Sequence, residues 1–131
     1  MKKALSALLA LCLAASCALP ALATEGYGNL RRTRTYADGV FSDVAPDAWY
    51  RDSVAAVYEL GLMEGDDGVF GAENPVLLSE AVTLSARLHS LYRTGSAPFP
   101  EPAAGEAWYA PYVAYALENG LLDAAGEDYT A

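Results

Sequence analysis

The amino-acid sequence predicts an all-α protein in which a short helix-turn-helix unit occurs twice, the second time in part. A shift of 59 positions aligns Trp49–Tyr50 with Trp108–Tyr109, and Gly61–Leu62 with Gly120–Leu121. The aligned tryptophans are the two that the 131-residue chain contains. Apolar residues within the copies recur three and four positions apart, as on one face of an α-helix. Because a unit this short cannot bury its apolar face alone, the copies are expected to pack against each other.

The first 23 residues predict a signal peptide. Lys2 and Lys3 give a positive start, residues 4–19 are mostly apolar, and residues 21–23 have the Ala-Leu-Ala pattern of a cleavage site. The apolar run is shorter than the roughly 20 residues of a membrane-spanning helix. We therefore expect a secreted protein without a transmembrane span.

Both cysteines, Cys12 and Cys17, lie in this leader, so a mature chain would contain neither a disulfide nor a cysteine metal site. Residues 14–17 also resemble a bacterial lipobox, in which the cysteine carries a lipid, although Ala14 stands where leucine is usual. A lipoprotein anchored through Cys17 is the minor alternative.

Three segments are expected after the leader. Residues 24–40 predict a flexible N-terminal arm, residues 41–95 the first unit, and residues 96–131 a proline-rich linker with a partial second unit.

The first helix of the first unit is expected from about Trp49 to Leu60. Asp47 is a candidate N-cap, and Gly61 stands where a left-handed residue would end the helix. Its apolar face would be formed by Val54, Val57 and Tyr58.

A tight surface loop and a second helix are expected next. The Gly-Asp-Asp-Gly run at 65–68 favours a turn, with Phe70 as its aromatic anchor. The second helix should begin near Ser79 or Glu80 and stop by Gly95. Its helical spacing is seen in Ala81, Leu84, Leu88, Leu91 and Tyr92.

Several separated markers occur in a fixed order: Phe-Ser-Asp-Val at 41–44, Trp49–Tyr50, Gly-Val-Phe at 68–70, Asn-Pro-Val at 74–76, and Glu80. Together they resemble the S-layer homology (SLH) module. The resemblance implies a bundle of short helices and an exported module that is not an enzyme. It also implies non-covalent attachment to a secondary cell-wall polysaccharide, often pyruvylated, held in grooves between repeats. Further SLH repeats or other chains would be its protein partners.

The chain departs from the family pattern where Leu77, Leu78 and Ser79 stand in place of Thr, Arg and Ala. A guanidinium suits bidentate contact with a ketal carboxylate, and leucine offers neither charge nor donor. Leu77 also cannot complete a capping box, so Ser79 is an alternative cap. These losses favour a second interpretation, a degenerate module with a structural role and no glycan binding.

The second copy reaches only the turn after its first helix. Either the sequence is the N-terminal part of a larger surface protein, or another chain completes the bundle. In the second case an open helix face would drive association. That face would contain Val113, Leu117 and Leu121.

The resemblance and the aromatic pairs suggest a set of candidate glycan-binding residues: Asp43, Trp49, Tyr50, Gly65, Glu80, Trp108 and Tyr109. The tryptophans are either stacking platforms for sugar rings or the first core residues of their helices, and core packing is the favoured interpretation. Asp43 would orient a ligand hydroxyl or cap the helix entry.

Other function classes find little support. The net charge of −9, from 17 acidic and 8 basic residues, disfavours nucleic acid. His89 is the sole histidine and no nucleophile motif accompanies it, so neither a catalytic site nor a cofactor is expected. The acids of residues 64–73 lack the spacing of a calcium loop. The one basic cluster consists of Arg31, Arg32 and Arg34. It is expected to be part of the flexible arm, and contact with an anionic wall polymer is the alternative.

Overall fold

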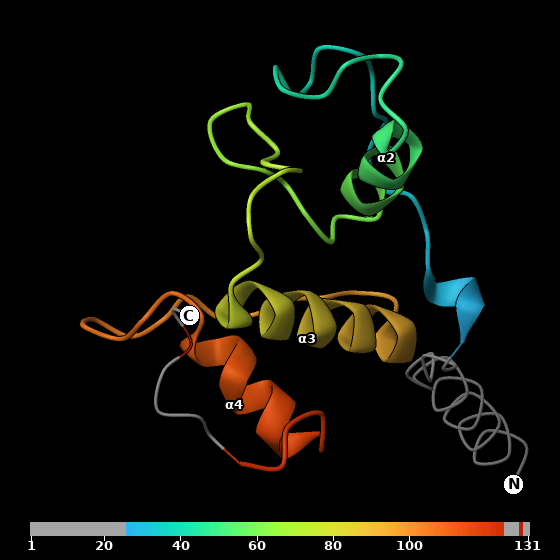
Figure 1. Ribbon diagram of the computed structural model, residues 1–131. Coiled ribbons are helices and arrows are strands. Elements are labelled where there is room, and N and C mark those ends of the chain that lie inside the picture. The colour runs from blue at the N-terminus through green and yellow to red at the C-terminus, as the bar shows by residue number, and fades with distance from the viewer. Residues whose placement is uncertain (1–25, 125–128, 130–131) are drawn as a thin grey trace, which may run out of the picture.

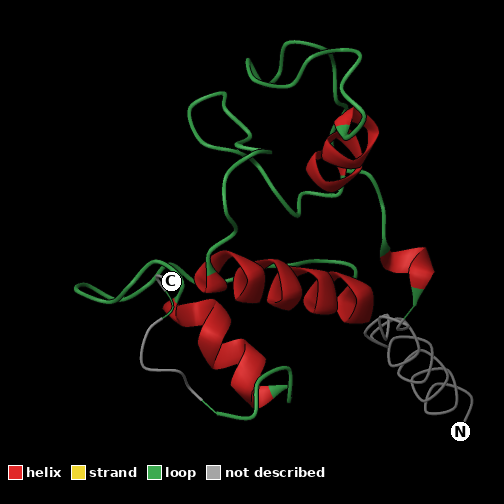
Figure 2. Cartoon of the chain, viewed as in Figure 1, coloured by secondary structure: helices red, strands yellow, loops and turns green. Residues whose placement is uncertain are grey.

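The computed structural model describes residues 26–124 and Tyr129. Its helices are η1 (Tyr27–Asn29), α2 (Arg51–Glu59), α3 (Leu78–Thr94) and α4 (Ala110–Glu118). Within the described residues no strand forms, and the Asp66–Val69 bridge stands alone (Figures 1 and 2). The all-α prediction is therefore confirmed. The predicted signal peptide and Cys17 lie outside the described residues. Among the helices that are described, none has the length and apolar character needed to cross a membrane.

Helix α2 follows the prediction at its end and not at its start. Gly61 adopts a φ of +70°, as expected of a helix terminator. The N-cap is Tyr50, in a helical conformation and without a side-chain hydrogen bond, so the prediction of an Asp47 cap is wrong. Instead, the N–H of Arg51 donates to the carbonyl of Ala48 at 3.0 Å, so a backbone turn leads directly into the helix.

A first hydrophobic core lies under α2. It is built from the buried side chains of Tyr36, Phe41, Val44 and Val54, with Tyr58 and Phe70 packed against it. Of the predicted apolar face, Val54 is buried, whereas Val57 and Tyr58 are half-buried. Aromatic contacts connect the entrance of the unit to α2 and to the following loop. The Phe41 ring lies edge-to-face with Tyr58 at 5.4 Å and tilted against Phe70 at 5.3 Å.

Part of the predicted arm belongs to this core. Tyr36 is only 8% exposed, and its N–H donates to a carboxylate oxygen of Glu59 at 3.0 Å. The other carboxylate oxygen of Glu59 pairs with Arg32 at 3.0 Å, and the Glu59 carbonyl accepts from the N–H of Thr33. Residues 32–36 are thus fastened along α2, because Glu59 is buried and needs partners for its charge.

Helix α3 begins one residue before the predicted start and ends where predicted. Gly95 follows it with a left-handed φ of +77° and donates its N–H to the Leu91 carbonyl. At the N-terminus the N–H of Leu77 donates to the Glu80 carboxylate at 2.9 Å, which is half of a capping box. The other half is missing because leucine has no side-chain oxygen. Ser79 is not the cap, because it lies inside the helix, where its N–H donates to the carbonyl of Tyr129 at 2.9 Å.

Helix α3 packs against α4, the first helix of the second unit (Figure 1). The shared core contains Val82 of α3 with Ala116 and Tyr129, and Val113 packs against it. The expectation that Val113 lies on an open face is therefore wrong, because α3 covers that face. Leu121 is exposed, as that expectation required.

The two units repeat each other in geometry. Helices α2 and α4 occupy equivalent positions, and the hydrogen bond from Leu62 to the Val57 carbonyl recurs between Leu121 and the Ala116 carbonyl, at 2.9 and 2.8 Å. The equivalence fails at the entrances. Phe41 is buried in the first core, whereas Phe99 packs on two tyrosines of α4 at 4.6 and 5.2 Å. Those tyrosines are Tyr112 and Tyr115.

Candidate functional site

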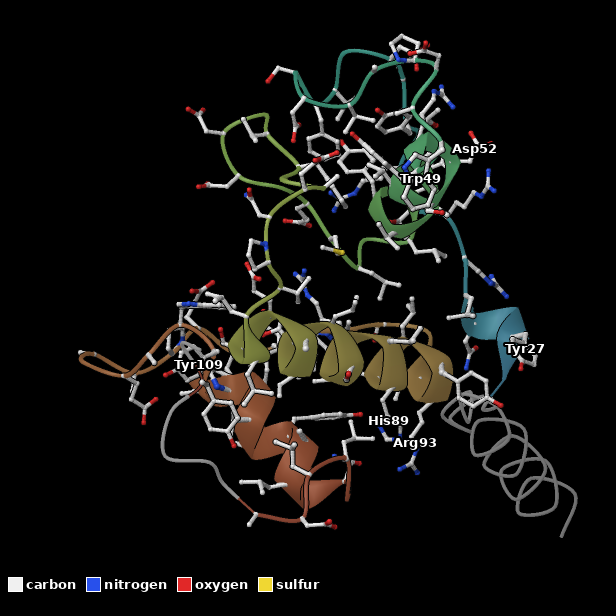
Figure 3. The ribbon with its side chains drawn as sticks, in the orientation of Figure 1. Tyr27, Trp49, Asp52, His89, Arg93 and Tyr109 are labelled. Atoms are coloured by element: carbon white, nitrogen blue, oxygen red, sulfur yellow. The ribbon has the colours of Figure 1, made fainter. Side chains whose placement is uncertain are left out.

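The tryptophans lie at the surface, which overturns the favoured expectation that they are core residues. Trp49 is 91% exposed and Trp108 is 52% exposed. Each ring stands edge-on to the following tyrosine at 5.5 Å, with interplanar angles of 82° and 83°. Figure 3 shows Trp49 beside α2. An exposed indole held at one angle offers a flat apolar face to a ligand, as stacking on the C–H surface of a sugar requires.

The tyrosines of these pairs serve a different purpose. Tyr50 and Tyr109 are half-buried N-cap residues, and they pack against the first and the second core, respectively. Their packing fixes the position from which each neighbouring tryptophan side chain projects into the solvent. The site therefore depends on both residues of each pair, although only the tryptophans face outward.

Asp43 supports the loop that follows the 65–68 turn. Its two carboxylate oxygens accept hydrogen bonds from the backbone N–H groups of Phe70, at 2.8 Å, and Gly71, at 2.7 Å. These bonds favour the charged form and hold the pKa of Asp43 below its ordinary value. The helix-entry cap considered for Asp43 is not formed, because the carboxylate binds this distant loop instead.

Gly65 is required by the packing of the same loop. It has a φ of +68°, and a Cβ built on it would lie 2.6 Å from both the Phe41 ring and the Val69 carbonyl oxygen. The N–H of Asp66 donates to that carbonyl and the N–H of Val69 donates back, which closes a tight two-residue turn. Gly65 thus allows Phe41 to reach the loop, and its role in the described residues is structural.

Glu80 lies at the exposed N-terminus of α3, beside the two leucines that replace the family's polar pair. Leu77 is 38% exposed and Leu78 is 44% exposed. Val82, one turn after Leu78, belongs to the cluster against which Tyr109 packs. This end of α3 therefore adjoins the start of α4 (Figure 1). Apolar residues thus occupy the surface where the motif would place a donor and a charge.

The candidate residues therefore form two groups. Asp43, Tyr50 and Gly65 lie around the first core, while Glu80 lies in the first turn of α3 and Tyr109 at the N-cap of α4, the two helices that share the second core. Each group has one exposed tryptophan at its side. Within the described residues no set of three or more His, Cys, Asp or Glu side chains is arranged to hold a metal ion.

Comparison with known proteins agrees with this geometry. A family model described as the S-layer homology domain matches residues 40–82, which include the first core apart from Tyr36 and also the first turn of α3. The chain contains an S-layer homology domain. Over 98 residues it is 31% identical to the surface-layer 125 kDa protein of Lysinibacillus sphaericus. This match covers 73% of the chain but only 8% of that relative. No solved structure matches with significance.

Two further residues, Arg51 and Tyr129, make structural contacts that the sequence did not reveal. Arg51 pairs with Asp38 at 2.6 Å and lies over the Tyr36 ring at 5.3 Å, immediately after Trp49–Tyr50. The hydrogen bond to Asp38 raises the pKa of Arg51. Tyr129 could have been found, because the 59-residue shift aligns it with Phe70. Arg51 gave no such signal, because its partners come from the segment expected to be a loose arm.

Proposed function

We propose that the chain is an exported cell-surface module that attaches without a covalent bond to an acidic cell-wall polysaccharide. Residues 1–23 direct export, and no reaction is assigned. The observation that carries the proposal is the exposed Trp49 at a fixed position of a matched S-layer homology domain. A large indole exposed to this degree has no role in the core and is suited to stacking on a sugar ring.

The two groups of candidate residues supply the binding surface. Trp49 and Trp108 stack on sugar rings, Tyr50 and Tyr109 position them, and Glu80 accepts sugar hydroxyls at the start of α3. Asp43 and Gly65 act indirectly, because their contacts fix the loop at 65–71. Further S-layer homology repeats or other chains extend the same surface.

Retention on purified wall sacculi tests this proposal. We expect intact sacculi to retain the protein and sacculi stripped of polysaccharide by acid to release it. Trp49→Ala should reduce retention about tenfold, because loss of one aromatic stack costs roughly 1 to 1.5 kcal/mol. Leu121→Ala, which removes an exposed apolar side chain outside the candidate groups, is the matched control and should be retained like the wild type. Equal retention on intact and stripped sacculi would disprove glycan attachment.

A second function is favoured by the exposed Leu77 and Leu78. In this alternative the module packs with other repeats or chains and binds no sugar, because the charge and the donor of the motif are absent. Leu78→Arg separates the two functions. If the module binds an acidic glycan here, the new guanidinium increases retention on sacculi. If the module is only structural, retention on intact and stripped walls stays equally low in both proteins.

A further inference from the structure

A shallow depression lies between η1 and α3, away from both groups of candidate residues. Its volume is about 450 Å³. Figure 3 shows Tyr27 of η1 near one end of α3, and His89 and Arg93 on that helix. The lining residues are Tyr27, Leu30, Ser85, Leu88, His89 and Tyr92.

Backbone contacts fix the shape of this depression. The side-chain amide of Asn29 donates to the Tyr92 carbonyl at 2.8 Å, and the N–H of Gly26 donates to the same carbonyl at 3.1 Å. The rings of Tyr27 and Tyr92 then meet edge to face at 5.7 Å. Tyr27 is nevertheless 83% exposed, so one face of an immobilised aromatic ring remains open to a ligand.

A few polar atoms lie at the edge of the apolar walls. The Nδ1 atom of His89 is engaged by the Tyr115 hydroxyl at 3.0 Å, which orients the ring. Its Nε2 has no hydrogen-bond partner within residues 26–124 and Tyr129. The Ser85 hydroxyl donates to the Ala81 carbonyl and keeps lone pairs for a further donor. Apolar walls with a small number of directed polar groups are typical of sites for small polar ligands.

Two arginines belong to the segments that form the depression, although neither is a lining residue. Arg93 lies one turn after His89 on α3, and residues four apart share a helix face. Arg31 follows η1 closely in the sequence, and its Nε donates to the Gly28 carbonyl, so that its side chain folds back toward η1. In a chain with a net charge of −9, two arginines beside one aromatic depression favour a negatively charged ligand.

We propose that this depression binds an acidic sugar residue. The rings of Tyr27 and Tyr92 contact the sugar, while Arg31 and Arg93 attract its carboxylate. The inference deepens the proposed function and rests on it for the source of the ligand, the wall polysaccharide. It places recognition of the acid at the C-terminal end of α3, whereas the family motif would place an arginine at position 78, at the other end of the same helix.

A titration observed by NMR tests the depression directly. The full chain is titrated with methyl glucuronide and, separately, with the neutral methyl glucoside, and the ring signals of His89 are followed. His89 is the only histidine, so the signals need no assignment. We expect saturable shifts, with affinity for the glucuronide about tenfold higher, because a charged hydrogen bond adds to the stacking. Absence of shifts with both sugars, or equal affinity for the two, overturns the proposal.

Three variants locate the binding. Tyr27→Ala should abolish the shifts, and its exposed position means that the fold is kept. Arg93→Gln should reduce affinity for the glucuronide to that for the glucoside. Leu121→Ala, which removes an exposed apolar side chain outside both the depression and the proposed wall-binding surface, is the control and should leave both affinities unchanged. Shifts that persist in Tyr27→Ala would place the sugar elsewhere and overturn the inference.

The sacculus experiment keeps the two proposals distinguishable. If intact walls retain the protein and the His89 signals do not respond to either sugar, the inference about the depression fails and wall attachment stands. If the signals respond and the walls do not retain the protein, the acidic-sugar site stands and wall attachment fails.

Discussion

Gly65 is restricted to glycine by two separate constraints, its backbone angle and the space around it. The left-handed φ alone costs an L-residue about 1 to 2 kcal/mol, and a Cβ 2.6 Å from the Phe41 ring adds overpacking. We expect Gly65→Ala to lower the free energy of unfolding by about 2 to 4 kcal/mol in urea titrations. Gly120→Ala is the matched control, with a φ of +67° and no described atom within 4 Å of the added methyl. An equal loss in both variants would show that the Phe41 contact has no effect.

Asp43 makes the stability of the first unit depend on pH. Because hydrogen bonds from Phe70 and Gly71 lower its pKa in the folded state, its contribution is complete above the unfolded value of 3.8. The contribution is then lost as the pH falls through the lower folded value. We expect Asp43→Ala to be less stable than the wild type at about pH 7, and the difference to shrink toward about pH 3. Urea unfolding at both pH values measures this.

Asp47→Ala provides the comparison for that experiment. Asp47 is an exposed acid close to Asp43 and caps no helix, so its removal should change stability by less than about 0.5 kcal/mol at either pH. A pH-dependent loss of the same size in both variants would mean that general charge effects, and not the bonds to the loop, are responsible.

At the scale of elements, the N-terminus of α3 is capped on one side only. Glu80 accepts from the Leu77 N–H, but Leu77 returns no hydrogen bond to the first turn. Leu77→Thr supplies the missing oxygen and should raise the free energy of unfolding by about 0.5 to 2 kcal/mol. Thermal and urea denaturation measure the gain. The double variant Leu77→Thr with Glu80→Ala should lose part of it, and a gain that is unaffected by Glu80→Ala would rule out a reciprocal box.

The sequence predicted where helices end better than where they begin. Gly61 and Gly95 end α2 and α3 as expected, because a left-handed glycine acts through its own backbone. The start of α2 was misassigned, since Asp47 has the right chemistry for a cap but the backbone enters the helix through a turn at Ala48. A single residue type therefore predicts a helix boundary only when that residue's own backbone conformation ends the helix, as it does for Gly61 and Gly95.

The same limit explains the candidate site. The 59-residue shift correctly paired Trp49 with Trp108, and the family markers located the loop that holds Asp43 and Gly65. Periodicity could not reveal which helix faces would be covered, because α3 packs on α4 of the next unit. The tryptophans were expected in the core as the first core residues of their helices, but they are found at the surface. Contacts of the arm with Glu59 were missed for a similar reason, because residues 32–36 show no helical spacing.

At the scale of the whole molecule, two separate cores are connected through α3. The first contains Val54 and the second contains Val82, and the two clusters share no residue. Between them, Arg87 of α3 donates to the Leu62 carbonyl at 3.1 Å and lies 5.9 Å from the centre of the Tyr112 ring. Such sparse contacts suggest that the units lose their structure separately.

Fluorescence of single-tryptophan variants tests this separation, because each unit contains one tryptophan. Val54→Ala should lower the unfolding midpoint reported by Trp49, and Val82→Ala the midpoint reported by Trp108, each corresponding to about 2 kcal/mol. The other midpoint should move little in each case. Equal shifts of both midpoints in both variants would instead show a single cooperative transition.

The hydrogen bond from Ser79 to Tyr129 shows that the sequence repeat and the packed unit have different boundaries. By alignment α3 belongs to the first repeat, but it packs with the second. A boundary drawn at Gly95, where the first repeat ends by alignment, separates α3 from the helix that it covers and uncovers Val82. A boundary after Asn74 leaves each core with its own covering segments. Anyone who excises, shuffles or fuses these repeats should therefore cut between the turn and α3, about a third of the 59-residue period earlier than the alignment suggests.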